Sequence, residues 1–293
     1  MSEPILGRLI TAMVTPFDAS GAVDPERAEQ LAVRLVDEQR NDSVLVNGTT
    51  GEAPTTSDAE KCELIRVVKA AVGDRAKVIA GVGTFNTAHS VELAKASRDA
   101  GADALLTVTP YYSLPPQEAL VAHFRTIASA TDLPMVLYDI PHRAGRPIET
   151  PSLIALAEHP NIVGVKDAKN DIVASSQVMA ATGLDYYAGD DAKLLPMLAV
   201  GAAGVVGTST HFTGRRTAEL IRAWLDGDHA KALAIHREML PVYTGVFVTQ
   251  GVMMVKAGLA HQGFDVGGLR SPMIWPTDEV VAGFTALLDS IVL

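Results

Sequence analysis

One lysine of this sequence stands where an amine can act as a nucleophile. Lys166 closes the apolar run 162–166, whereas Lys77 opens such a run and most other lysines fall in helix-like stretches. An ammonium group that is buried loses solvation, so its pKa falls and the free amine can attack a ketone. The resulting imine is an electron sink, and a neighbouring carbon can then be deprotonated. Lys166 therefore indicates Schiff-base chemistry; the alternative is a lysine that extends from the strand end into solvent.

The spacing around Lys166 predicts which side chains surround it. In a strand, alternate residues share a face, so Ile162, Gly164 and Lys166 are expected on one side. If that side points into the protein, the small Gly164 leaves room around the ammonium group. The run 135–138 precedes this one along the chain and ends in Tyr138. A phenol placed beside Lys166 can relay protons, although a tyrosine hydrogen-bonded for packing fits the same position.

Three further segments offer groups that bind anions or cover a site. In Gly48-Thr49-Thr50-Gly51-Glu52, two hydroxyls and consecutive N–H groups can hold a carboxylate; an ordinary turn is the alternative. Arg143 can bind an anionic substrate group, or remain solvated. The pair Tyr111-Tyr112 follows another apolar run and is expected on a loop, where aromatic residues more often form an interface than take part in chemistry.

Several classes of site and partner are disfavoured. The 8 histidines show no HxH or HExxH spacing, which disfavours a metal-dependent aldolase. The single Cys62 has no second thiol for a disulfide or CxxC site. It is predicted to lie in a helix and to be packed as a structural residue. Lys and Arg number 24 against 34 Asp and Glu, for a net charge of −10, so no nucleic-acid partner is expected. A small-molecule substrate is expected instead.

The sequence also gives no sign of a membrane segment. The longest nearly apolar run, 194–207, contains Pro196 and is too short to span a bilayer. The first residues lack the basic and apolar regions of a signal peptide. A cytoplasmic location is the expectation.

Eight short apolar runs, each followed by an amphipathic stretch, recur along the chain as far as about residue 225. Their continuous apolar character predicts strands buried on both faces, as in a parallel sheet, with helices between them. A GxGxxG motif after the first run is absent, so a (β/α)8 barrel is favoured over a doubly wound sheet. Active sites of such barrels lie at the carboxyl ends of the strands. The predicted strands are 9–14, 43–47, 77–82, 104–108, 135–138, 162–166, 186–189 and 204–208.

The last part of the chain changes character. Residues 229–240, 247–261 and 277–293 are predicted as helices with no further strands. We therefore expect a catalytic barrel domain over residues 1–226 and a helical extension over residues 227–293.

Taken together, these residues resemble the dihydrodipicolinate synthase / N-acetylneuraminate lyase family of class I aldolases. Each motif alone is modest evidence, but their order on successive predicted strands is very specific. The resemblance extends over the whole chain through Val14-Thr15-Pro16-Phe17, Gly48-Thr49-Thr50-Gly51-Glu52, Thr109-Pro110-Tyr111-Tyr112, Tyr138-Asp139-Ile140-Pro141, Gly164-Val165-Lys166-Asp167 and Gly189-Asp190-Asp191.

The resemblance implies a role for each candidate residue. Lys166 would form the imine with pyruvate, so no metal or other cofactor is expected. Proton transfer would run through Tyr138, Thr49 and Tyr112, with Tyr112 reaching into a neighbouring subunit of a homotetramer. Thr50 would bind the pyruvate carboxylate together with Thr49. Arg143 would bind the carboxylate of the second substrate, and Gly189 and Val206 would line the pocket through backbone contacts.

Two features favour the synthases of this family, which condense pyruvate with aspartate semialdehyde. They are the double threonine at 49–50 and the arginine shortly after the tyrosine motif, Arg143. A lyase for 2-keto-3-deoxy sugar acids or N-acetylneuraminate is the alternative, and a non-catalytic ligand-binding barrel is a third. Two positions depart from the pattern: His142 replaces a small residue, and the segment 249–256 lacks the Asn-Pro that often precedes its lysine.

The resemblance also raises the question of feedback inhibition. Lysine-inhibited relatives bind lysine at the dimer interface with polar residues, often His and Glu, after the GTTGE motif and after the third strand. Here those regions carry Lys61 and His89, which would repel the ammonium groups of lysine, while Asp58 is a carboxylate that could accept them. The sequence predicts an enzyme insensitive to lysine.

Overall fold

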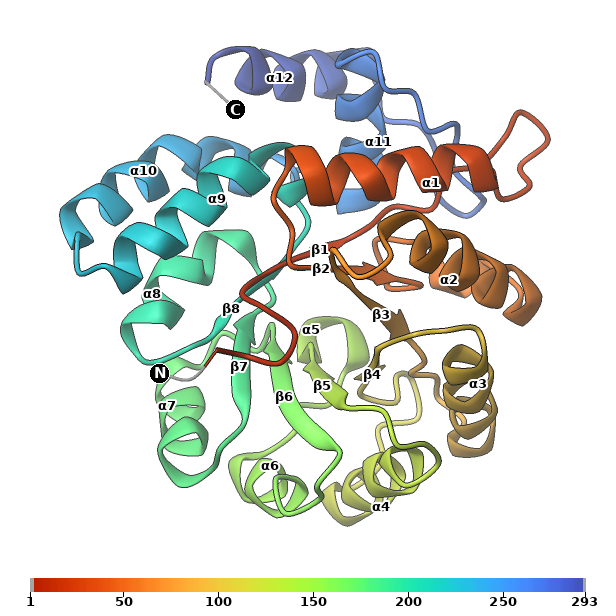
Figure 1. The fold of residues 1–293 in the computed structure, drawn as a ribbon, viewed down its shortest axis with the longest axis vertical. Helices are drawn as coiled ribbons and strands as arrows, with labels where there is room; N and C mark the ends of the chain where they lie inside the picture. The colour runs from red at the N-terminus through yellow and green to blue at the C-terminus, as the bar shows by residue number, and fades with distance from the viewer. Residues whose placement is uncertain (1–2, 292–293) are drawn as a thin grey trace.

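The centre of the molecule is a closed barrel of eight parallel strands, and consecutive strands are neighbours throughout (Figure 1). The computed structural model describes residues 3–291. The strands are β1 (Leu9–Ala12), β2 (Ser43–Val46), β3 (Lys77–Gly81), β4 (Ala104–Val108), β5 (Met135–Asp139), β6 (Ile162–Asp167), β7 (Asp185–Ala188) and β8 (Gly204–Gly207). All eight predicted strands and the (β/α)8 fold are confirmed.

Helices surround this barrel, and local signals set where several of them begin. Ser57 caps α2 through a capping box with Glu60, and Asn86 accepts two backbone N–H groups at the start of α3. The outer elements are α1 (Pro25–Val33), the π-helical η1 (Arg34–Glu38), the 3-10 turn η2 (Ala53–Thr55), α2 (Asp58–Val72), α3 (Thr87–Asp99), α4 (Gln117–Ala128), α5 (Pro141–Ala144), α6 (Thr150–Leu156), α7 (Ile172–Ala181), the 3-10 turn η3 (Asp191–Lys193), α8 (Leu194–Ala199) and α9 (Thr210–Leu225).

Strand residues divide between two cores because their side chains alternate. Those that point inward, such as Ile10, Leu45 and Val136, fill the barrel, and those that point outward, such as Leu137 and Val165, pack under the helices. This continuous burial on both faces is what made the strands recognisable in the sequence.

An irregularity in β6 corrects one sequence-based expectation. The register between β5 and β6 shifts at Met135/Val136, so that Met135 pairs with Ile162 but Val136 pairs with Gly164. The extra residue, Val163, reverses the alternation at this point. Ile162 therefore belongs to the outer core, while Gly164 and Lys166 keep the inward phase. The prediction that Ile162 shares their face was wrong.

Three helices follow the barrel: α10 (His229–Gly245), α11 (Gly251–His261) and α12 (Asp278–Asp289). In Figure 1, α10 lies beside α9, and α11 and α12 lie on the side of the barrel that carries α1. Residues of α10 and α12 belong to the same outer core as the barrel helices. The boundary at 226/227 stays a prediction.

The bounds of these helices differ from the predicted ones. α10 continues through Pro241 instead of ending at Leu240, because Pro241 lies on the exposed side while Met239, Val242 and Tyr243 are buried. The segment 247–250 is not helical, since the Gln250 side chain accepts the Val252 N–H and caps α11. α12 is shorter than the predicted 277–293, of which residues 292–293 lie outside the described part.

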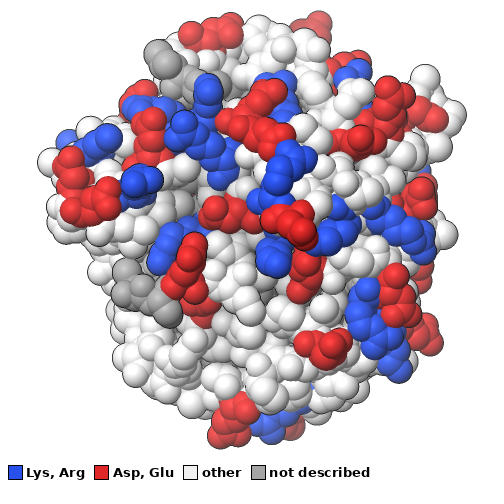
Figure 2. All heavy atoms as spheres, in the orientation of Figure 1, with Lys and Arg blue, Asp and Glu red and all other residues white. Residues whose placement is uncertain are grey.

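Within residues 3–291, no helix has the length and apolar character needed to cross a membrane. Figure 2 shows one face of the molecule, on which basic and acidic side chains are interspersed instead of forming a basic patch.

Candidate active site

A cavity of about 790 Å³ opens where the strands end. Most of the predicted site residues line it, although they come from different strands and loops: Thr49, Thr50, Tyr138, Arg143, Lys166 and Gly189. Residues from the far end of the chain complete the wall: Thr249, which opens the segment 249–256 quoted from the sequence, and three residues that the sequence did not indicate, Tyr243, Thr244 and Phe247. The sequence carried no local signal for these three, because only the packing of α10 and the segment after it on the barrel brings them to the cavity.

Lys166 lies inside the barrel, where it is 6% exposed. Burial lowers the pKa of Lys166 to about 7; Asp191 opposes this shift and Arg143 adds to it. The unprotonated amine, which attack on a ketone requires, is therefore far more available near neutral pH than in a solvated lysine.

Tyr138 is the register partner of Lys166 on β5, and the Lys166 Nζ lies 4.2 Å from the centre of the Tyr138 ring. Burial raises the pKa of Tyr138 to about 12, so its hydroxyl stays protonated at neutral pH. The predicted juxtaposition of an amine and a phenol is thus present. Both groups have the protonation states that proton exchange between amine, phenol and substrate requires.

Gly164 serves a purpose other than the one expected. A Cβ on this residue would lie 2.5 Å from the carbonyl oxygen of Asp185 on β7. The glycine is therefore required by the close approach of two strands, instead of by room around the ammonium group. Gly189 is similarly confined, because a Cβ there would lie 2.9 Å from the Asp167 carbonyl oxygen.

A buried carboxylate lies close enough to Lys166 to influence its charge. Asp191 accepts the hydroxyl of Ser209 (2.6 Å) and the backbone N–H of Thr208 (3.0 Å). Thr208 lines the cavity, and its Oγ1 is 3.4 Å from Oγ1 of Thr50. Asp191 belongs to the Gly189-Asp190-Asp191 motif of the sequence, from which no role for it was predicted. Its position two residues after the Gly189 turn was the available signal.

Arg143 lies on the short helix α5 at the exposed rim of the cavity. Among residues 3–291, no carboxylate forms an ion pair with its guanidinium group. A forked donor at the mouth of a cavity is suited to bind a carboxylate of a small molecule. His142, beside it, also lines the cavity.

Two predicted site residues do not reach this cavity within one chain. Tyr112 is 95% exposed, with φ at 73°, and Tyr111 lines the cavity instead, packed edge-on against Phe85 at 5.4 Å. Val206 is buried in the inner core of the barrel and is not part of the cavity wall. The side chain of Val206 therefore contributes to packing below the site.

His211 and Cys62 are packed as structural residues. His211 is buried, accepts the Val14 N–H at Nε2 and contacts the Thr208 carbonyl through Nδ1. Burial lowers its pKa to about 4, so it is neutral. Cys62 packs against the outer core from α2. Across residues 3–291, no three His, Cys, Asp or Glu side chains converge as a metal-binding group would require.

Comparison with known proteins gives one consistent result. The model of the dihydrodipicolinate synthetase family matches residues 5–291. A 4-hydroxy-tetrahydrodipicolinate synthase from Cutibacterium acnes is 58% identical over 289 residues, which cover 99% of both chains. One from Acidothermus cellulolyticus is 56% identical over 94% of this chain and 89% of its own.

Solved structures agree with these sequence matches. The dihydrodipicolinate synthase of Bacillus anthracis superposes with a TM-score of 0.96 at 37% identity, covering 99% of this chain and 100% of the other. The enzyme from Cyanidioschyzon merolae, solved with lysine bound, has a TM-score of 0.96 at 39% identity, covering 98% and 99%.

Proposed function

The chain belongs to the dihydrodipicolinate synthetase family, and from that membership we propose that it condenses pyruvate with L-aspartate 4-semialdehyde to 4-hydroxy-tetrahydrodipicolinate. This reaction serves lysine and diaminopimelate biosynthesis, and we place it in the cytoplasm. The observation that carries the proposal is the buried Lys166, whose pKa is lowered to about 7 and whose Nζ lies against the Tyr138 ring, in a cavity with Arg143 at its rim.

In the proposed mechanism, the Lys166 amine attacks the ketone carbon of pyruvate, and loss of water gives an imine. Thr49 and Thr50 hold the pyruvate carboxylate through hydroxyl and N–H groups. Removal of a proton from the pyruvate methyl gives an enamine, with Tyr138 as a proton carrier. The enamine carbon bonds to the aldehyde carbon of the second substrate. The amine of that substrate then attacks the imine carbon, closes the ring and releases Lys166. One water leaves overall, and no metal or cofactor is needed.

The acceptor aldehyde is tested by competition. We expect kcat/KM for aspartate semialdehyde to exceed that for sugar aldehydes, because Arg143 matches the carboxylate of the semialdehyde. Arg143→Gln is expected to raise the KM for the semialdehyde about tenfold to a hundredfold, the effect of losing a charged hydrogen bond. The borohydride-trapped pyruvate adduct should form as in the unmodified protein. A preference for a sugar aldehyde would contradict the proposal and favour a lyase.

We further propose a homotetramer in which Tyr112 completes the site of a neighbouring subunit. Its 95% exposure, on a loop beside the cavity-lining Tyr111, supports this assignment. Mixing inactive Lys166→Met subunits with Tyr112→Phe subunits is expected to restore some activity, because hybrid pairs contain one site with both residues intact. Mass spectrometry verifies that hybrids have formed. Verified hybrids without recovered activity would show that Tyr112 acts within its own chain.

We also propose that lysine does not inhibit the enzyme. Asp58, the carboxylate available for an ammonium group, is already 2.8 Å from His89 Nε2 and 3.8 Å from Lys61 Nζ. A lysine ligand would have to displace these partners, so millimolar lysine should leave initial rates unchanged at saturating pyruvate. Half-inhibition below about 1 mM, a binding free energy of only about 4 kcal/mol, would contradict this expectation.

A further inference from the structure

Glu52 is a buried carboxylate directly after the two threonines of the site. It is 4% exposed, and its φ of 56° lies in the left-handed region that residues other than glycine rarely adopt. Its N–H donates to the carbonyl oxygen of Thr49 at 3.1 Å, and its own carbonyl oxygen accepts the N–H of Thr55 at 2.9 Å. The conformation of Glu52 therefore sets the path of the loop that carries Thr49 and Thr50.

Both carboxylate oxygens of Glu52 have partners from the C-terminal part of the chain. Lys256 on α11, whose side chain is fully buried, forms an ion pair in which Nζ lies 2.8 Å from Oε1, and it donates a hydrogen bond to the Gly268 carbonyl oxygen at 2.6 Å. The backbone N–H of Arg270 donates to Oε2 at 3.0 Å. Residues more than 200 positions away thus hold the side chain that follows the Thr49–Thr50 pair.

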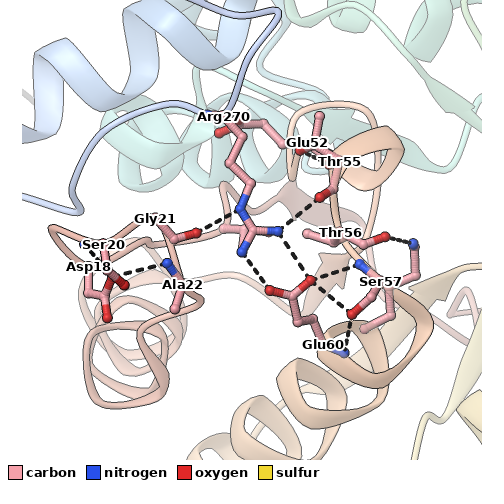
Figure 3. A network of polar contacts seen from close by, with 12 residues as sticks. Asp18, Ser20, Gly21, Ala22, Glu52, Thr55, Thr56, Ser57, Glu60 and Arg270 are labelled. Atoms are coloured by element: carbon pink, nitrogen blue, oxygen red, sulfur yellow. Dashed lines mark hydrogen bonds and ion pairs between the residues drawn. The ribbon is translucent and has the colours of Figure 1, made fainter.

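The Arg270 side chain binds the segment that follows Glu52 and the N-terminal loop at Gly21 (Figure 3). It donates to the carbonyl oxygens of Gly21 and Thr55, both at 2.8 Å, and forms an ion pair with Glu60. Both cations contact the Phe17 ring, whose centre is 4.2 Å from Lys256 Nζ and 4.3 Å from Arg270 Cζ. The loop is therefore braced against both the N-terminal and the C-terminal segments.

We propose that Glu52 is a positioning residue, held by Lys256 and Arg270, that fixes Thr49 and Thr50 for the substrate carboxylate. A buried ion pair adds little net stability, because the attraction is offset by the loss of solvation. Its effect is to specify one conformation of the loop, so that donors are in place before the substrate arrives. This inference rests on the proposed function, in which the two threonines hold the carboxylate of pyruvate.

The test separates positioning from stability with three variants: Glu52→Gln, Lys256→Met and the double variant. Each single variant leaves one buried charge without its partner, whereas the double variant leaves neither. We expect Glu52→Gln to lower the Tm and to raise the KM for pyruvate about tenfold or more, since a small misplacement of the donors weakens binding. The KM for the aldehyde should change less than about twofold. In the double variant the Tm should recover while the KM for pyruvate stays raised.

A matched control pair lies far from the site. Lys69 and Asp103 form a partly buried ion pair at 2.9 Å, and Asp103 precedes β4 at the opposite end of the barrel. Lys69→Met and Asp103→Asn should lower the Tm without changing the KM for pyruvate. An unchanged KM in Glu52→Gln, a KM that recovers together with the Tm, or a double variant that does not fold would each overturn the positioning role. Absence of turnover in the unmodified protein would instead overturn the proposed function.

Discussion

Replacing Lys166 by methionine is expected to abolish imine formation with pyruvate and to lower kcat by about 10⁴-fold or more, as for other covalent nucleophiles. Methionine approximates the length of the lysine side chain, so the cavity keeps its shape while the amine is lost. Borohydride reduction in the presence of pyruvate, followed by mass spectrometry of the peptides, locates the adduct. In the unmodified protein one pyruvyl adduct should appear, on Lys166.

Lys77→Met is the matched control, because Lys77 lies on a strand at the end of the barrel away from the site. It should retain the adduct and the activity. An adduct that persists in Lys166→Met, or that forms on another lysine of the unmodified protein, would show that Lys166 is not the nucleophile.

The same Lys166→Met substitution is expected to make the folded protein more stable at neutral pH. Burial lowers the pKa of Lys166 from 10.5 to about 7. A pKa difference of one unit corresponds to about 1.4 kcal/mol, so at low pH the buried charged amine lowers the free energy of unfolding by roughly 4–5 kcal/mol. Methionine has no charged form to bury. Its Tm at pH 7 should therefore rise by several degrees.

The stability of the unmodified protein is expected to depend on pH because Lys166 has different pKa values in the folded and unfolded states. Between pH 7 and 10.5 the unfolded chain keeps the Lys166 proton while the folded chain has lost it, so the unfolded state binds more protons. Stability of the unmodified protein therefore rises with pH across that window, and the full cost applies below about pH 7. Denaturant unfolding of both proteins from pH 6 to 10 should show the gap closing. A variant less stable than the unmodified protein would mean that Lys166 is charged and stabilised by Asp191.

The sequence was most informative where burial is continuous along the chain. The eight strands are apolar on both faces, so each run stood out, and Lys166 and Tyr138 could be paired from strand order alone. The shift at Val163 was not foreseeable, because one inserted residue leaves an apolar strand looking the same. It changed the assignment of Ile162 but left Lys166 facing inward.

Contacts between distant parts of the chain could not be predicted from local sequence patterns. The sequence contains no signal that Glu52 meets Lys256, since that ion pair depends on how α11 packs against the barrel. The same holds for Tyr243 and Phe247, which were placed in a helical extension but line the cavity. The predicted end of α10 at Leu240 was wrong because the helix continues through the exposed Pro241, and the burial of Met239, Val242 and Tyr243 depends on packing that no local pattern contains.

The ion pair between Glu52 and Lys256 has a consequence for the order in which the protein is built on the ribosome. All eight strands leave the ribosome before Lys256 does, because β8 ends at Gly207. Until α11 emerges, Glu52 lacks its ion pair with Lys256, and the left-handed backbone conformation of Glu52 lacks the stabilisation that this ion pair provides. The strands can begin to pair during synthesis, whereas the loop of Thr49 and Thr50, which we propose binds the substrate carboxylate, gains its last contacts only with α11 and Arg270. We therefore expect an incomplete chain, lacking α11, to bind pyruvate only weakly even where its strands have already formed.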